Sequence, residues 1–327
     1  MIMETMILSI LISFVAALAG GVVAIPLLRS LKAGQPIREL GPESHYKKAG
    51  TPTMGGIIMA FGVLVTCLIY MNKLFTYSWV TLAASLAFGL MGGLDDLLKI
   101  LKHNSDGLRA YQKILFQLVF SVLIAVFAYN NEAVGTKLYV PFFDLEWDLG
   151  IWYIPFTTFC IIALTNGVNL TDGLDGLSGG VTMIVSATFT IILYGMAEAG
   201  SVVGKDLVIF AAALTGACLG FLRFNSYPAR VFMGDLGAFF LGGGIAMLFV
   251  LTRLQLMIPL MGIIYTVSDL SVVLQVGSYK LRNKKRIFLM APLHHHFEKK
   301  GIPETKIVSN YMLVTAAACL IALLGVL

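Results

Sequence analysis

Carboxylate side chains recur in three short, glycine-rich stretches of the sequence. Asp95 and Asp96 end the stretch Gly92-Gly93-Leu94-Asp95-Asp96, and Asp235 ends the stretch Phe232-Met233-Gly234-Asp235. The third stretch has Asn or Asp at every third position, as Asn166, Asn169, Asp172 and Asp175. Adjacent carboxylates repel each other unless a cation compensates, and Mg²⁺ prefers oxygen ligands, of which a protein need supply only one or two. The three stretches therefore suit Mg²⁺ and phosphate chemistry.

Each of these stretches also has a simpler structural explanation. The pair Asp95-Asp96 could be a solvated helix end, and a lone Asp before a helix, as Asp235 is, usually serves as an N-cap. Phe232 is of a type more often found in a core, although an aromatic ring beside such a loop could also stack on a base. A turn rich in Asx caps would explain the third stretch.

The glycines of the third stretch predict where its helix ends. Gly173 and Gly176 disfavour a helix, so we expect Asn166 and Asn169 near a helix end and a loop from Asp172 onward. Glycines also let backbone N–H groups approach a ligand closely. Polar residues at a membrane edge are costly enough that a functional interpretation is the default.

Basic and imidazole groups occupy two further stretches. Lys47 and Lys48 precede Thr51-Pro52-Thr53 and two glycines, which fits an anion-binding turn as well as an ordinary membrane anchor. His294, His295 and His296 are consecutive. Because successive side chains of a helix diverge by ~100°, the three histidines do not converge on one ion, which argues against zinc. We expect them to donate to phosphate or sugar oxygens.

The composition places these residues in a membrane protein. Hydrophobic residues make up 58% of the 327 residues and charged residues 13%, whereas soluble domains have about 25% charged residues. The chain therefore lacks the polar surface of a soluble globule, and a disordered chain would need low hydrophobicity. The four cysteines lie in apolar stretches without a CxxC, so neither a disulfide framework nor a zinc knuckle is indicated.

Ten apolar runs are candidates for membrane-spanning helices of ~20 residues. They cover 6–28, 53–71, 75–94, 111–129, 150–168, 179–197, 206–222, 236–252, 256–279 and 309–327. Continuous runs argue against a β-barrel, whose strands alternate. We expect an all-α polytopic membrane protein with about ten transmembrane helices, in which 1–327 form a single integral membrane domain. The connection 130–149 could form a small hairpin.

The charges orient the bundle. Of the 23 lysines and arginines, all but Lys73, Lys137, Lys205 and Arg253 lie in or beside the loops that follow odd-numbered runs. An excess of Lys and Arg marks the cytoplasmic side, so these loops, with all the polar stretches described above, are expected on the cytoplasmic face and both termini outside. The basic residues lie next to the membrane, which gives no support for nucleic-acid binding.

Six motifs now carry a resemblance to a known family. They are KKAGTPTMGG at 47–56, GGLDD at 92–96, NGVNLTDGLDGLSGG at 166–180, FMGD at 232–235, LQVGSYK at 274–280 and APLHHHFE at 291–298. The motifs occur in the order in which a known family has them. The chain closely resembles the phospho-N-acetylmuramoyl-pentapeptide transferase (MraY) family of the polyprenyl-phosphate hexosamine-1-phosphate transferase superfamily. The carboxylate motifs are shared across the superfamily, and the histidine motif points to the muramoyl-pentapeptide branch.

The resemblance implies a reaction in a bacterial inner membrane. Undecaprenyl phosphate and UDP-MurNAc-pentapeptide would give lipid I and UMP with the help of Mg²⁺, the first membrane step of peptidoglycan synthesis. Because a phosphate monoester has its second pKa near ~6, much of the lipid phosphate is a dianion at pH 7. Positioning then matters more than a strong general base, and a route through a phospho-aspartyl enzyme stays open. The oligomeric state also stays open, with a homodimer among the alternatives.

Site roles follow from the resemblance. Asp235 is the leading Mg²⁺ ligand, Asp95 would orient or deprotonate the lipid phosphate with Asp96 beside it, and His294 joins them as a catalytic candidate. The candidates for uridine and sugar contacts are Asn169, Asp172, Gly173, Asp175, Asn225, Phe232 and Gln275. The candidates for phosphate contacts are Lys48, Thr53, Lys113, His295 and His296.

One position departs from the family pattern, and two other classes of membrane protein are alternatives to this family. The family commonly has Glu before x-Leu/Ile-Ser-Val, whereas this chain has Ser268-Asp269-Leu270-Ser271-Val272, so the role of that acid is open at Asp269. A sister transferase of GlcNAc-1-phosphate would share the Asp motifs but not usually the histidine motif. A transporter would place its polar residues near the bilayer midplane in repeated halves, which this sequence does not do.

Overall fold

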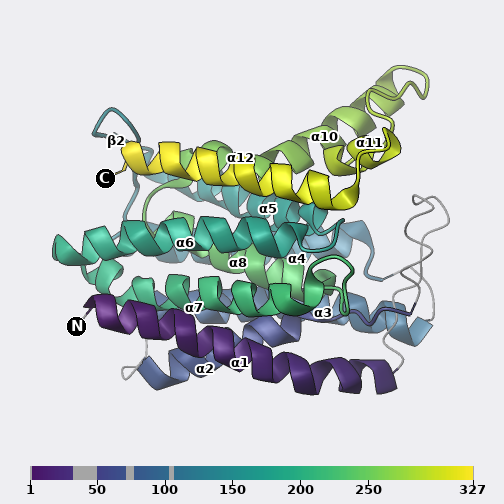
Figure 1. Cartoon of the computed structure of the whole chain (residues 1–327). Coiled ribbons are helices and arrows are strands. Elements are labelled where there is room, and N and C mark those ends of the chain that lie inside the picture. The colour runs from purple at the N-terminus through teal and green to yellow at the C-terminus, as the bar shows by residue number, and fades with distance from the viewer. Residues whose placement is uncertain (1, 32–49, 71–76, 103–106, 327) are drawn as a thin grey trace.

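The computed structural model of the chain describes residues 2–31, 50–70, 77–102 and 107–326. Within these ranges, eight helices are long and apolar enough to cross a membrane. They are α1 (Ile2–Ser30), α3 (Tyr77–Lys102), α4 (Ala110–Tyr129), α5 (Tyr153–Thr171), α6 (Leu177–Glu198), α7 (Val202–Asn225), α8 (Gly234–Leu251) and α12 (Glu304–Leu324). The expected polytopic helical fold is confirmed (Figure 1).

Two of the ten apolar runs form something other than a straight span. The run 256–279 is a broken helix, in which the segments Gln255–Met261 and Ile263–Leu281 meet at 85°. The first comprises a 3-10 turn (η3, Gln255–Met257) and α9 (Ile258–Met261), and the second is α10 (Ile263–Leu281). The run 53–71 gives α2 (Gly56–Tyr70), whose 15 residues reach only about 22 Å of the ~30 Å hydrocarbon core. The described residues therefore give eight or nine spans plus one short apolar helix.

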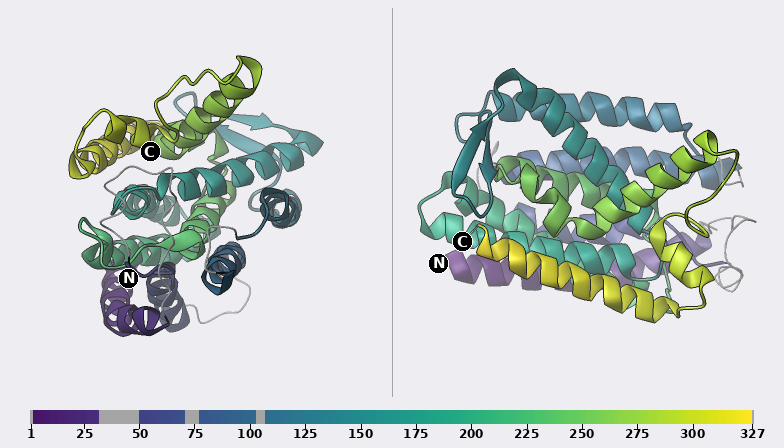
Figure 2. Two further views of the ribbon diagram at one scale, coloured as in Figure 1. Left: turned by 90° about the vertical axis from the view of Figure 1, so that its right-hand side faces the viewer. Right: turned by 90° about the horizontal axis from the view of Figure 1, so that it is seen from above.

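Helix α8 forms the centre of the bundle. Nearly every residue of α8 is buried, and it packs against α3 along most of its length and also against α5 and α2 (Figure 2). Three consecutive glycines make this packing close. A Cβ at Gly242 would lie 2.8 Å from Thr165, and one at Gly243 would lie 2.9 Å from Phe88. Within a membrane the hydrophobic effect does not drive helices together. Small residues favour helix association there because they let the backbones approach closely.

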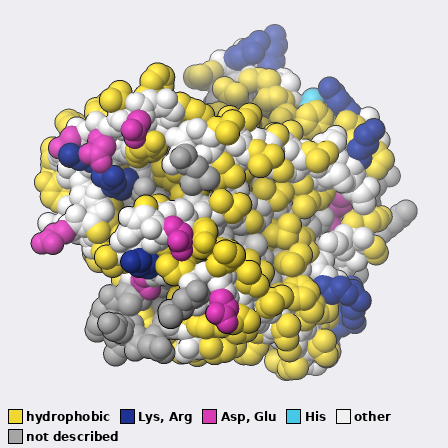
Figure 3. Space-filling view, turned by 60° about the vertical axis from the view of Figure 1, so that its left-hand side comes forward, with side chains coloured by type: hydrophobic (Ala, Val, Ile, Leu, Met, Phe, Trp, Pro, Cys, Tyr) yellow, Lys and Arg dark blue, Asp and Glu magenta, His cyan; other side chains and the backbone are white. Residues whose placement is uncertain are grey.

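The two ends of the bundle differ. Both termini lie at one end, together with a hairpin of β1 (Lys137–Val140) and β2 (Leu145–Asp148), while the loops before α6 and α8 and the short helix α11 (Leu293–Lys299) lie at the other (Figure 1). The expected hairpin is confirmed as an antiparallel pair with Leu138 opposite Trp147. On the face seen in Figure 3, a broad area of hydrophobic side chains lies between charged groups near the two ends of the molecule.

The charge distribution predicts which end faces the cytoplasm. Single cysteines replacing Asn131, beside the hairpin, and Asn283, after α10, should label differently in intact cells. Only the cysteine at 131 should react with an impermeant thiol reagent, because the basic loops face inward. The four native cysteines are buried, so their background labelling should be low. Equal labelling at both positions would show that the assigned topology is wrong.

Candidate active site

Three carboxylates converge at the end of the bundle opposite the termini. Asp95 and Asp96 lie on α3 and are 1% and 2% exposed, while Asp235 lies in the first turn of α8. One oxygen from each carboxylate lies within 4.8 Å of the other two. Gly92 makes this convergence feasible, because a Cβ at this position would collide with the backbone carbonyl of Asp235.

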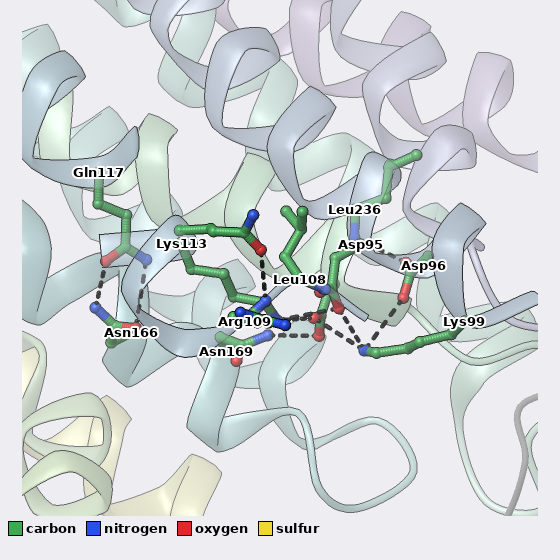
Figure 4. A network of polar contacts seen from close by, with 12 residues as sticks. Asp95, Asp96, Lys99, Leu108, Arg109, Lys113, Gln117, Asn166, Asn169 and Leu236 are labelled. Carbon is green, nitrogen blue, oxygen red and sulfur yellow. Dashed lines mark hydrogen bonds and ion pairs between the residues drawn. The ribbon is translucent and has the colours of Figure 1, made fainter. Parts of the chain in front are cut away.

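Two lysines supply the opposite charge (Figure 4). Lys99 Nζ lies 2.6 Å from Asp95 Oδ2, 3.1 Å from Asp235 Oδ2 and 3.9 Å from Asp96 Oδ1. Lys113, from the first turn of α4, places its Nζ 3.0 Å from Asp95 Oδ2 and 2.8 Å from Asp235 Oδ2. Unpaired buried carboxylates would be strongly destabilising, so the two ammonium groups are what allows this cluster to exist.

The other oxygen of each carboxylate is fixed by an N–H donor. The backbone N–H of Leu108 donates to Asp95 Oδ1 at 2.6 Å, and that of Leu236 donates to Asp96 Oδ2 at 3.0 Å. Asn169 Nδ2 donates to Asp235 Oδ1 at 2.9 Å. The carboxylates are thus turned so that their remaining oxygens face the ammonium group of Lys99.

This arrangement of oxygens fits a divalent cation. The three remaining oxygens already converge on one positive charge, that of Lys99, and all three belong to the donor class that hard cations prefer. Asp95, Asp96 and Asp235 can therefore bind a metal ion. The structure does not support the N-cap interpretation of Asp235, because the N-cap position of α8 belongs to Met233.

A reciprocal amide pair aligns the helices that carry Lys113 and Asn169. Gln117, which is fully buried on α4, donates through Nε2 to Asn166 Oδ1 at 3.3 Å and accepts from Asn166 Nδ2 at 2.9 Å. Lys113 lies one turn before Gln117, and Asn169 lies one turn after Asn166. The pair therefore sets the position of both side chains relative to Asp235.

The third carboxylate-rich stretch begins as the sequence predicted. Helix α5 ends at Thr171, and α6 starts at Leu177 after a loop. Asp172 directly follows α5 and is half-buried. Burial, reinforced by the nearby carboxylates of Asp235, Asp96 and Asp175, raises the pKa of Asp172 to about 8. A carboxyl group that is largely protonated near neutral pH can donate a hydrogen bond.

Asp175 and Asn225 connect the loops on this face. Asp175 Oδ2 accepts from the backbone N–H of Ala229 at 2.9 Å, and its own N–H donates to Glu304 Oε1 at 2.7 Å. Asn225 accepts from the N–H of Gly176 at 3.0 Å and donates to the carbonyl of Val231 at 3.0 Å. These two side chains hold the loop before α6 against the loop before α8.

Backbone hydrogen bonds align the 51–56 motif with Phe232. The N–H of Phe232 donates to Pro52 O at 2.8 Å, and its carbonyl accepts from the N–H of Gly55 at 2.9 Å. Thr53 is 3% exposed, and its hydroxyl has no hydrogen-bond partner in the described part of the chain. It lies against Gly234, which has φ +74, and a Cβ on that glycine would lie 2.7 Å from Thr53 Oγ1. Lys48 lies outside the described residues.

The histidines do not all diverge as expected, because the ring centroids of His294 and His295 lie 4.2 Å apart and only His296 turns away from them. His294 is fully buried, and a Cβ at Gly173 would collide with its ring and lie 3.1 Å from His295 Nε2. His295 Nδ1 lies 2.6 Å from Glu298 Oε2. His296 Nδ1 instead accepts from the backbone N–H of Leu289 at 3.1 Å. The first two imidazoles therefore adjoin the loop that contains Asp172, and the third holds its own segment in place.

Gln275 and Asp269 lie along α10 and have different surroundings. Gln275 accepts from the N–H groups of Ile287 and Phe288 at 3.0 Å each and donates to the carbonyl of Phe288 at 2.9 Å. It thus holds the segment before α11 against α10. Asp269 faces α5, where a Cβ at Gly167 would lie 3.0 Å from its Oδ2, and it is not one of the three converging carboxylates.

Sequence reasoning did not assign roles to Lys99, Gln117 or Glu304. Lys99 had a readable signal, because it lies four residues after Asp95 and three after Asp96, a spacing that pairs side chains on one helix face. Gln117 was an amide inside an apolar run, which is unusual enough to suggest a buried partner. Glu304 gave no local signal, since its partner Asp175 is 129 residues away.

Comparison with known proteins shows which protein families this chain matches. The sequence profile of glycosyl transferase family 4 matches residues 78–253, and signature 1 of the phospho-N-acetylmuramoyl-pentapeptide-transferases matches residues 48–58. The chain is 45% identical over 325 residues to a protein of that name from Clostridium novyi, covering 99% of this chain and 98% of the relative. Proteins of the same name from Clostridium perfringens and Caldanaerobacter subterraneus are each 46% identical, over 98% of this chain and 99% and 98% of the respective relatives. These matches favour the muramoyl-pentapeptide branch over its sister branch.

The contact between Gly173 and the histidines can be tested by adding one methyl group. Gly173→Ala should displace the His294 ring and lower the transferase rate at least about tenfold, because misplaced site groups cost rate steeply. Gly277→Ala is the matched control, since a Cβ at residue 277 meets nothing within 4 Å. The measurement is the initial transfer rate together with the thermal midpoint of each variant. Similar rates for both variants would mean that the histidines need not lie against this loop.

Proposed function

The chain belongs to the phospho-N-acetylmuramoyl-pentapeptide-transferase family, and on that premise we propose that its carboxylate and lysine cluster binds Mg²⁺ and the donor diphosphate. The protein is a multi-pass membrane transferase of phospho-MurNAc-pentapeptide. In the proposed reaction, UDP-MurNAc-pentapeptide and undecaprenyl phosphate give lipid I and UMP, with 1–327 acting as one catalytic unit. An oxygen of the lipid phosphate bonds to the sugar-bearing phosphorus, and the bond from that phosphorus to the leaving UMP oxygen breaks.

The observation that carries this proposal is the convergence of Asp95, Asp96 and Asp235 on the ammonium groups of Lys99 and Lys113. Two ammonium groups balance two of the three carboxylates. A divalent cation would then give the cluster a net positive charge, which would attract the anionic diphosphate. Fixed charges placed where negative charge develops are usually the largest contribution to catalysis of this kind.

We assign Asp235 as the principal Mg²⁺ ligand, with Asp95 and Asp96 beside it. A bound Mg²⁺ would neutralise charge on the phosphate oxygens during transfer. Lys99 and Lys113 would donate to those oxygens, because an ammonium group is a common phosphate partner in proteins. The sequence already made Lys113 a candidate phosphate contact. Lys99 becomes one because its ammonium group lies against Asp95 and Asp235.

Asp95 is proposed to orient the lipid phosphate. Its Oδ1 accepts from the N–H of Leu108, and its Oδ2 lies within 3.0 Å of both lysines. Both oxygens are thus engaged, which favours direct transfer over an aspartyl-phosphate intermediate. Since the lipid phosphate is largely a dianion at pH 7, its alignment contributes more than removal of a proton.

The groups around the Asp172 loop are proposed to bind the nucleotide-sugar. Asn169 donates to Asp235 of the acidic cluster and Asp172 lies just after it at the end of α5, while Phe232 is half-exposed three residues before Asp235. His294 and His295, against Gly173, would donate to phosphate or sugar oxygens. The side chains of Asp175, Asn225 and Gln275 form hydrogen bonds with backbone groups, so their proposed contribution is to hold these loops. Contacts of Thr53 and His296 with the substrate stay predictions. The formation of a homodimer also stays a prediction.

The metal assignment predicts different outcomes for two carboxylates. Asp235→Asn keeps size and polarity but removes the negative charge that a cation needs, so transfer should fall at least about a hundredfold. Its Mg²⁺ dependence should shift to higher concentration. Asp175→Asn should mainly raise the KM for the nucleotide through the loop that Asp175 holds, and leave the Mg²⁺ dependence unchanged.

The measurement is the rate against Mg²⁺ concentration for both purified variants, with thermal midpoints and the binding of Mn²⁺ as a spectroscopic substitute. Asp148→Asn, on the exposed hairpin strand β2, is the control for loss of a carboxylate elsewhere. An Asp235→Asn protein with the Mg²⁺ curve and Mn²⁺ binding of the unmodified chain would contradict the assignment.

A further inference from the structure

Three arginines surround a cavity on the outer surface of the bundle, away from the carboxylate cluster. The cavity has a volume of about 530 Å³ and lies between α1 and the end of α7. Arg29 comes from the last turn of α1, Arg223 from the last turn of α7, and Arg230 from the loop before α8. All three side chains are exposed. They lie at the end of the bundle that carries the candidate active site.

No acid in the described part of the chain neutralises these arginines. Within the described part of the chain, none of the three guanidinium groups forms an ion pair with an Asp or Glu. By contrast, Arg253 at the opposite end pairs with Glu146 at 2.8 Å. Three like charges around one hollow repel each other, so the cavity is complementary to an anion.

An aromatic ring fixes two of the three guanidinium groups. Those of Arg223 and Arg230 lie 6.0 Å and 5.8 Å from the centre of the Phe224 ring, a distance typical of cation–π attraction. The ring is itself held against α1, where a Cβ at Gly21 would collide with it. The backbone N–H of Arg230 also donates to Phe224 O at 2.8 Å. The arginines are therefore positioned by the fold, unlike freely moving basic side chains.

The remaining walls of the cavity are apolar and extend along α1. Leu18, Val22 and Ile25 line it together with Arg29. From Leu18 to Arg29 the helix rises by about 16 Å, which is close to half of the ~30 Å hydrocarbon core. Val22 is 68% exposed and Val23 is 70% exposed, so this face of α1 is turned toward lipid. The cavity thus combines a cationic end with an apolar wall one leaflet deep.

We propose that this arginine pocket binds the phosphate headgroup of an anionic glycerophospholipid, with one acyl chain lying along Leu18 and Val22. A phosphate that reacts must reach Asp95 and Asp235, and the pocket shares no lining residue with that cluster. A resident lipid therefore fits it better than the polyprenyl substrate does. Guanidinium groups bind phosphate oxygens through paired N–H donors, and basic pockets between membrane helices are known to bind acidic lipid headgroups.

The test measures thermal unfolding of the purified full chain in phosphatidylcholine nanodiscs with and without phosphatidylglycerol. A ligand that binds only the folded state stabilises it, so phosphatidylglycerol should raise the midpoint by about 3 °C or more. The double variant Arg223→Gln/Arg230→Gln should lose this shift. Val22→Trp should lose it as well, because it keeps all three charges and obstructs the apolar wall. Lys284→Gln/Lys285→Gln removes two basic residues outside the pocket and should keep the shift.

Three outcomes would overturn the proposal. An equal shift in all variants would mean that the basic residues attract acidic lipids without a specific site. A comparable shift with inorganic phosphate alone would indicate a site for a soluble anion. A raised KM for polyprenyl phosphate in both pocket variants without phosphatidylglycerol would assign the pocket to the substrate.

Discussion

Electrostatic repulsion among three carboxylates is the constraint on which the active end of this molecule depends. Their oxygens lie within 4.8 Å of one another, and two of the side chains are almost fully buried. Water screens charges poorly there, and Lys99 and Lys113, at 2.6–3.1 Å from Asp95 and Asp235, balance two of the three negative charges. Because Lys113 comes from α4 and the carboxylates come from α3 and α8, this compensation also joins three helices at the end where the loops must be ordered.

Close backbone approach is the second requirement, and glycine meets it at each point of contact. Gly92 lets α3 touch the start of α8, and Gly173 gives room to the His294 ring. A Cβ at Gly107 would collide with the Asp95 carboxylate, so only a glycine lets the chain before α4 pass over that group and offer the N–H of Leu108. The charged groups are thus oriented by backbone atoms, which move less than long side chains do.

The sequence predicted the parts of this structure that are local. Apolar run length located the spans, and the glycines after Asn169 predicted the end of α5, because both signals depend on neighbouring residues alone. The 85° break before α10 and the short α2 were not predicted, since hydropathy measures the length of a run and not its direction. Lys99 was counted as a cytoplasmic charge and not as a site residue. Its role depends on Asp235, which lies 136 positions further along the chain.

The difference between local sequence signals and long-range contacts also explains why residues of one motif have different roles. Asn169 and Asp175 belong to one stretch of evenly spaced polar residues, yet Asn169 donates to Asp235 while Asp175 accepts from a backbone N–H of the next loop. The helix ends between them, so the spacing that places Asn166 and Asn169 near one face no longer applies after Thr171. The helix end thus supplies amide groups, which bind Gln117 and orient Asp235, and the loop after it supplies the carboxylates of Asp172 and Asp175. The rigid part therefore positions the acidic cluster, while the loop connects it to the neighbouring segments, within ten residues of the chain.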